Sequence, residues 1–167
     1  MHTSILLLAL SGLVATDTAA PKWQTNYPNA KKHGAELGKP LAVFLGSGNE
    51  GWQKLTREGT LSEEARNVLA NKYVCVHIDT ATEKGRAWAE AFEMTSGLGI
   101  VISDHTGKQQ AFRHEGDLED SRLVQYLQRY GDPSYVARST ESNPGQERRS
   151  YFEPAPLQYS APSYCPS

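Results

Sequence analysis

The sequence contains little sulfur and no excess of charge of either sign. Only two cysteines occur among its 167 residues, which excludes a scaffold held together by several disulfides, so a hydrophobic core must stabilise any folded domain. The formal net charge is -2 at pH 7, which provides neither the basic surface typical of nucleic-acid-binding proteins nor a strong acidic field. We therefore expect no nucleic-acid partner.

Apolar runs long enough to cross a membrane are also missing. A transmembrane helix needs about 20 apolar residues, whereas the first apolar run spans only residues 5–14. The small residues Thr18, Ala19 and Ala20 follow it, a pattern typical of a secretory signal peptide. We predict that residues 1–20 are a signal peptide, that the protein is exported to the periplasm or the extracellular space, and that no transmembrane segment remains after signal removal. An uncleaved anchor is the alternative.

Helical and strand-like patterns alternate along the next part of the chain. Helices are expected where apolar residues recur at helical spacing after a capping residue, with predicted caps at Thr60, Thr80 and Asp117. Continuous or alternating apolar runs predict the strands. The predicted order is helix 26–37, strand 41–45, a helix that opens at 52–57 and restarts at 60, strand 74–78, a helix from 80, strands 100–102 and 108–114, and a helix from 117 to 131.

The order of these elements predicts the fold class. Early alternation of strands and helices implies parallel strands, and the final pair of strands implies an antiparallel edge. We therefore predict an α/β fold, a three-layer α/β/α sandwich with a mixed central sheet and a C-terminal helix, occupying residues 21–131.

The composition changes after the last predicted helix. Residues 131–167 contain six of the nine prolines and four of the eight tyrosines, with few aliphatic residues. Such a segment buries too little apolar surface to offset the entropy of ordering it. We predict a disordered Pro/Tyr/Ser-rich tail over residues 132–167, which serves either as a solvated spacer or as a polyproline-type ligand.

Three segments carry a resemblance to a known fold. Residues 39–45 precede a glycine-rich turn and a helix, residues 74–79 form a strand that ends in Asp, and residues 100–107 combine a hydrophobic strand with an Asp-x-x-Gly turn. Together these segments resemble the thioredoxin fold over residues 23–131. The segments 46–48, 101–104 and 110–116 are also similar to exported bacterial thioredoxin-like proteins of unknown function that lack the cysteine pair.

The resemblance also shows which parts of the redox site are missing. Thioredoxins carry Cys-x-x-Cys at the start of the helix after the first core strand, where the helix N-terminus favours a thiolate. This sequence has Glu50, Gly51, Trp52 and Gln53 there, with no cysteine in residues 46–55. The buried acid of the family corresponds to Phe44. Thiol–disulfide exchange is chemically impossible at such a loop, so we expect a non-catalytic protein-binding or scaffolding module of the cell envelope.

The altered loop is the candidate binding site. It comprises Glu50, Gly51, Trp52 and Gln53, together with Leu98 and Gly99, which stand where the family's cis-proline would lie. An exposed Trp52 would make a suitable anchor for a partner. In the alternative interpretation Trp52 packs inward and Glu50 only complements the dipole of the following helix.

The two cysteines are possible thiol sites. Cys75 shares a strand face with His77, which would suit a nucleophile, but a cysteine in the middle of a strand is usually an inert buried thiol. Cys165 lies in the predicted tail and could form an intermolecular disulfide. Residual thiol-redox activity through Cys75, Cys165 or both is therefore the alternative function.

Two weaker patterns suggest other ligands. His105 and His114 flank the predicted hairpin, where its register could bring them to one face for a metal ion, although both positions suit ordinary solvated residues. The glycines at 46, 48 and 51 match a dinucleotide-binding pattern by letter, but no acidic residue stands about 20 residues further on. We expect no metal and no cofactor.

Overall fold

A five-stranded mixed sheet forms the centre of the fold in the computed structural model, which describes residues 20–142. The strand order is β1-β3-β2-β4-β5. β3 runs parallel to both β1 and β2, whereas β4 is antiparallel to β2 and β5 is antiparallel to β4. The strands are β1 (Trp23–Gln24), β2 (Leu41–Gly46), β3 (Val74–Asp79), β4 (Gly99–Ser103) and β5 (Gln110–Glu115).

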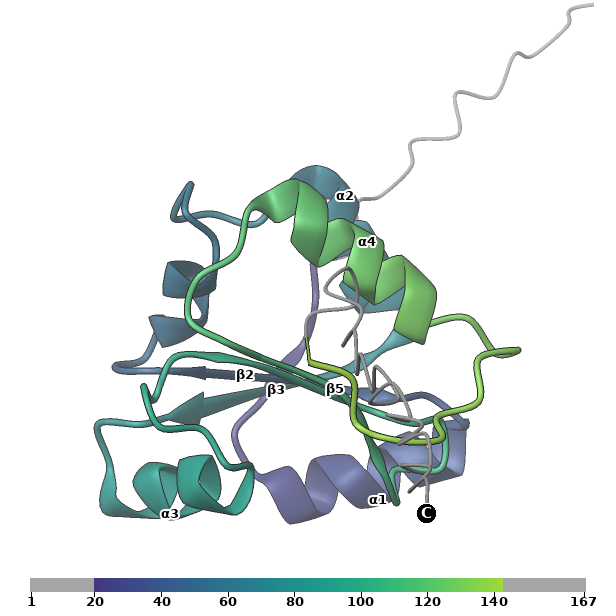
Figure 1. Cartoon of the computed structure of the whole chain (residues 1–167), viewed down its shortest axis with the longest axis horizontal. Helices are drawn as coiled ribbons and strands as arrows, with labels where there is room; N and C mark the ends of the chain where they lie inside the picture. Colours follow the sequence, from purple (N-terminus) through teal and green to yellow (C-terminus); the bar gives the residue numbers. More distant parts are fainter. Residues whose placement is uncertain (1–19, 143–167) are drawn as a thin grey trace, which may run out of the picture.

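Helices cover both faces of this sheet (Figure 1). α1 (Tyr27–Leu37) and α3 (Glu83–Ala91) lie on one face, and α2 (Glu63–Lys72) and α4 (Asp120–Tyr130) lie on the other. Each face has its own hydrophobic core, because all six residues of β2 are buried and the side chains of β3 alternate between the two layers. The predicted three-layer α/β/α sandwich with a mixed sheet is confirmed.

Two helices have their cap two residues later than predicted. Ser62, rather than Thr60, accepts the hydrogen bond from the amide of Ala65 at the start of α2. The expected cap at Thr80 is likewise replaced by Thr82, whose hydroxyl accepts from Gly85. The two predicted caps have other partners, because the Thr60 carbonyl accepts from Thr56 and the Thr80 hydroxyl donates to Gly97.

The prediction that Asp117 caps the last helix is also wrong. α4 begins at Asp120 after Glu119, whose side chain makes no capping hydrogen bond. Asp117 instead accepts from the guanidinium of Arg57 at 2.8 Å, and the carboxylate of Asp120 accepts from the amide of Ser62. These contacts join the segment before α4 to the segment before α2.

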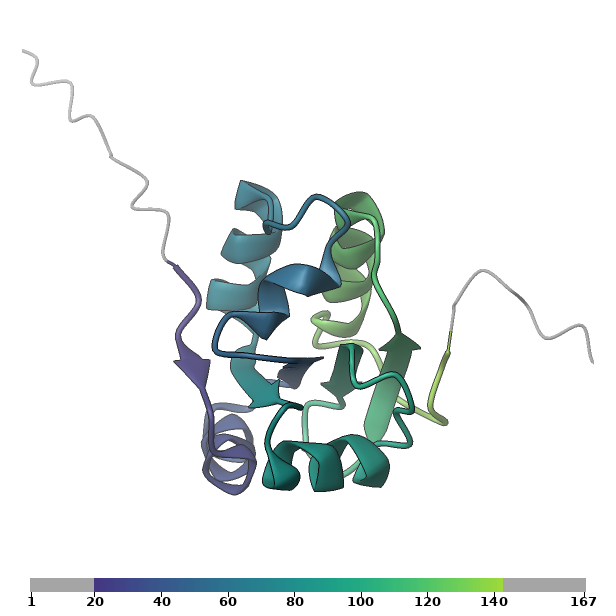
Figure 2. The same ribbon diagram turned by 90° about the vertical axis from the view of Figure 1, so that its left-hand side faces the viewer.

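Two elements differ from the predicted pattern. The edge strand β1 was not predicted, because its two residues are too few to show any periodicity. The helix expected at 52–57 is the five-residue 3₁₀ helix η1 (Gly51–Leu55), which an irregular segment separates from α2. Figure 2 shows η1 in front of the sheet and β1 at its edge.

The domain extends past its predicted end at Gly131. Residues 132–142 were expected in the tail, but Glu141 exchanges backbone hydrogen bonds with Ala111 and Arg113 of β5. Its carboxylate also accepts from the hydroxyls of Tyr130 and Tyr135 at 2.8 and 2.7 Å. The segment is poor in aliphatic residues, but Tyr135 and Ala137 pack against the core, and these hydrogen bonds add to that packing.

Several predictions fall on other parts of the chain. The signal peptide (except Ala20), Cys165 and the remainder of the predicted tail lie outside the described residues. Within residues 20–142, no helix is long and apolar enough to cross a membrane.

Candidate functional site

Close backbone packing shapes the loop that follows β2. Gly46 and Gly51 face each other so closely that a Cβ atom on either glycine would overlap the backbone of the other. The carboxylate of Asp79, at the end of β3, accepts from the amide of Gly48 at 2.7 Å and from that of Ala81 at 2.9 Å. The glycine pattern of this loop therefore reflects a tight turn.

Trp52 packs inward from this loop. Its ring stacks on that of Trp23 in β1, with centroids 4.8 Å apart and planes 24° apart. Trp23 in turn packs edge-on against Phe44 at 5.0 Å. Both tryptophans are half-buried, so Trp52 covers the core and is not a free anchor. The structure therefore favours the interpretation in which Trp52 packs inward over the one in which it is an exposed anchor.

Polar side chains form the outer surface of the same loop. Glu50 is exposed and makes no capping hydrogen bond, while the ammonium group of Lys54 donates to the carbonyl of Ser47 at 3.3 Å. Between them lies a groove of about 340 Å³. We call this surface the η1 groove; its lining residues are Ser47, Glu50, Gly51, Gln53, Lys54 and Gly59.

Leu98 and Gly99 lie beside the end of β2, as the resemblance implied. Gly99 pairs with Leu45, and a Cβ on Gly99 would overlap the carbonyl of His114. Leu98 is half-buried. The carboxylate of Glu115 accepts from the amides of Thr95 and Ser96 and thereby holds the turn before β4.

Cys75 lies in the core on the α2 and α4 side of the sheet. Its side chain is 2% exposed, and its Sγ donates to the carbonyl of Leu69 at 3.7 Å. Burial raises the pKa of this thiol to about 12. No hydrogen bond joins Cys75 to His77, although they share a face of β3. This environment is typical of an inert structural thiol.

The structure keeps His105 and His114 apart. The register of the hairpin pairs Ser103 with Gln110 at one end and Gly99 with Glu115 at the other, so the two histidines lie at opposite ends. His105 lies between the carbonyls of Gly38 and Asp132, at 3.3 and 3.0 Å. Within residues 20–142 no group of three or more His, Cys, Asp or Glu side chains could hold a metal ion.

Sequence reasoning identified the loop but missed several of its parts. Trp23 and Lys54 were not predicted as contributors, although the first supports Trp52 and the second lines the η1 groove. No local pattern links Trp23 to Trp52, because their contact depends on the pairing of β1 with β3. Lys54 directly follows Gln53 in the sequence, so its position alone could have added it to the predicted site.

Comparison with known proteins supports the fold. No protein-family model matches this sequence, and no curated protein matches it. A thioredoxin from Thermus thermophilus matches with a TM-score of 0.51 and 16% identity, over 66% of this chain and 86% of that one. A protein described as DsbH Oxidoreductase matches with a TM-score of 0.53 and 17% identity, over 75% and 93% of the two chains. This chain therefore has a thioredoxin-like fold.

Proposed function

We propose that this chain is an exported thioredoxin-like domain that binds a protein partner through the η1 groove without thiol–disulfide exchange. The observation that carries the proposal is the chemistry of the loop after β2. Residues 46–55 contain no sulfur, while the hydrogen bond from Gly48 to Asp79 and the packing of Gly46 on Gly51 fix the turn of this loop.

The remaining thiol of the described domain is poorly suited to exchange. Attack on a disulfide requires a thiolate that can reach its target. The side chain of Cys75 is buried and its pKa is raised, which opposes both requirements. The two structural neighbours are described as a thioredoxin and an oxidoreductase, but those activities belong to those proteins.

The η1 groove has the mixed character of a protein-binding surface. The carboxylate of Glu50, the amide of Gln53 and the ammonium of Lys54 provide both charges and a neutral hydrogen-bonding group. Half-buried Leu98 precedes Gly99, which pairs with Leu45 near the end of β2. Such polar and charged groups are typical of the rim of non-obligate protein interfaces.

The location of the partner follows from the predicted export. The apolar run at residues 5–14 and the small residues before Pro21 favour a signal peptide. We therefore place the partner in the cell envelope or outside the cell, where the tail could extend the reach of the domain.

Partner capture with charge-exchanged variants tests this proposal. The double change Glu50→Lys and Lys54→Glu reverses both charges of the η1 groove and keeps the net charge. The matched control, Lys32→Glu and Glu36→Lys, does the same on the exposed face of α1. A third variant, Cys75→Ala with Cys165→Ser, contains no sulfhydryl group.

The proposal predicts one envelope protein that is captured by the native chain, by the α1 control and by the cysteine-free variant. The groove variant should lose it, because reversed charges repel the complementary groups of the partner. Capture that needs the cysteines but tolerates the groove variant would instead support the redox alternative.

A further inference from the structure

A second cavity adjoins the same loop after β2, because Asn49 lines it while Ser47 and Glu50 line the η1 groove. It occupies about 410 Å³, within the range of about 300–1,000 Å³ that is typical of small-molecule pockets. Thr25 after β1, Asn49 after β2 and Asp79 at the end of β3 all line it. Ligands of open α/β sheets bind outside the carboxyl ends of parallel strands, and this cavity has that position. We call it the α3 cavity.

The end of β3 borders the α3 cavity through His77, Ile78 and Asp79. Side chains alternate along a strand, and Cys75 packs in the layer of α2 and α4, so the imidazole of His77 points into that layer and away from the cavity. The apolar side chain of Ile78 belongs to the core under α1 and α3 and faces the cavity.

Two opposite charges stand at the same cavity. Lys84, in the first turn of α3, supplies an ammonium group. The helix dipole favours a negative charge at this first turn, where Thr82 already accepts the hydrogen bond from the amide of Gly85. Asp79 supplies the carboxylate, and both of its hydrogen bonds, from Gly48 and Ala81, end on Oδ1. Its Oδ2 is therefore available to a cation.

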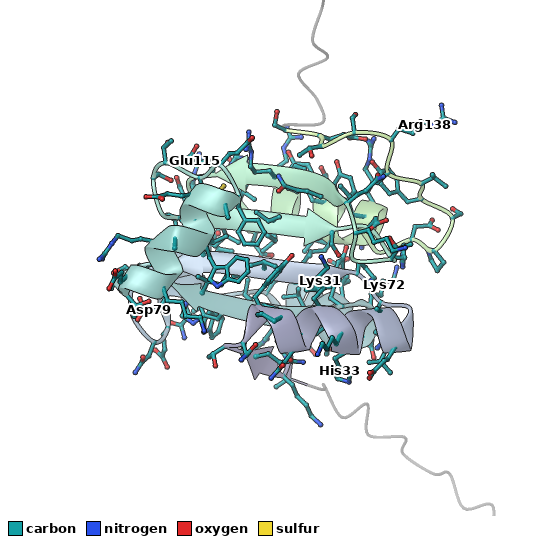
Figure 3. All side chains as sticks on the ribbon, turned by 90° about the horizontal axis from the view of Figure 1, so that it is seen from below. Lys31, His33, Lys72, Asp79, Glu115 and Arg138 are labelled. Carbon is teal, nitrogen blue, oxygen red and sulfur yellow. The ribbon has the colours of Figure 1, made fainter. Side chains whose placement is uncertain are left out.

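An aromatic wall completes the α3 cavity. Tyr27 of α1 and Trp88 of α3 line it, with ring centroids 4.7 Å apart. Both residues are half-buried, and Phe92 packs behind them in the same core. Figure 3 shows the molecule from the side of these two helices, with Asp79 labelled beside α3 and Lys31 over α1.

We propose that the α3 cavity binds a free α-amino acid with an aromatic or large apolar side chain. Its carboxylate would pair with Lys84 and the first turn of α3, its ammonium with Asp79, and its side chain with Tyr27 and Trp88. The net charge of the ionised lining groups is zero, which suits a zwitterion better than an anion or a cation. This inference does not depend on the function proposed for the η1 groove.

Three probes and three variants test the proposal. The probes are L-phenylalanine, 3-phenylpropionate, which lacks the amino group, and phenethylamine, which lacks the carboxylate. The dissociation constant of each is measured by amide NMR titration of the folded chain. The variants Lys84→Met and Asp79→Asn each remove one charge, and Lys31→Met is the control on α1. Asn at 79 can still accept from Gly48 and Ala81.

Phenylalanine should bind about tenfold more tightly than either truncated probe, the ratio expected for one charge-assisted hydrogen bond. Lys84→Met should weaken phenylalanine about tenfold and leave phenethylamine unchanged, whereas Asp79→Asn should weaken phenylalanine and leave 3-phenylpropionate unchanged. The control should weaken none of the probes. Absence of phenylalanine binding, equal affinity for the three probes, or binding that survives both charge variants would overturn the proposal.

Discussion

The thiol of Cys75 should react extremely slowly while the protein is folded. Its side chain is 2% exposed and contacts the carbonyl of Leu69. Burial raises its pKa from the ordinary value of 9.0 to about 12, and because each unit of pKa changes the thiolate population tenfold, about 1,000-fold less thiolate is present at about pH 8. The thiolate is the reactive form, so reaction requires transient opening of the domain.

The measurement uses the variant Cys165→Ser, in which Cys75 is the only thiol. Its reaction with Ellman's reagent is followed in buffer and in a denaturing concentration of urea. We expect the folded protein to react at least about 1,000-fold more slowly than the unfolded chain. A control with Ser47→Cys, Cys75→Ala and Cys165→Ser places a thiol in the exposed loop and should react rapidly without urea. A reaction rate of folded Cys75 within about tenfold of the rate in the unfolded chain would refute this prediction.

Three further predictions concern stability, each measured by urea unfolding. Burial lowers the pKa of His77 below 6.5, so as the pH falls His77 takes up a proton in the unfolded state before it does in the folded state. The free energy of unfolding should therefore decrease as the pH falls below 6.5, by up to about 1.4 kcal/mol per pH unit. His77→Gln should remove this contribution to the pH dependence. Glu141→Gln should lower stability by about 1 kcal/mol, since it disturbs hydrogen bonds from Tyr130 and Tyr135; no loss would mean that the carboxylate of Glu141 contributes nothing to stability. Gly85→Ala should cost about 1–3 kcal/mol, because its Cβ would overlap the carbonyl of Asp79, and a neutral result would contradict that packing.

The fold was predictable because its main signals are local. The uninterrupted apolar run of β2 indicated a central strand, and Gly38 and Gly131 marked the ends of α1 and α4. The caps were misplaced because Thr60 and Thr80 stand two residues from equally suitable residues, Ser62 and Thr82. Only long-range contacts decide between such neighbours, as the hydrogen bond from Thr80 to Gly97 illustrates.

The binding surfaces were less predictable because they are assembled from distant segments. The loop at Glu50 and Trp52 could be located from its place after the first core strand. The stack of Trp52 on Trp23 could not, because β1 gives no strand signal of its own. The α3 cavity has no sequence pattern either, since it combines the ends of three strands with side chains from two helices.

Insulin reduction tests the central claim most directly, namely that this thioredoxin-like domain works without thiol–disulfide exchange. The native chain is added to insulin and dithiothreitol, and the precipitation of reduced insulin is followed beside a sample without protein and a sample with the variant Cys75→Ala, Cys165→Ser. We predict the same rate in all three samples. Acceleration by the native chain that disappears in the cysteine-free variant would contradict the claim.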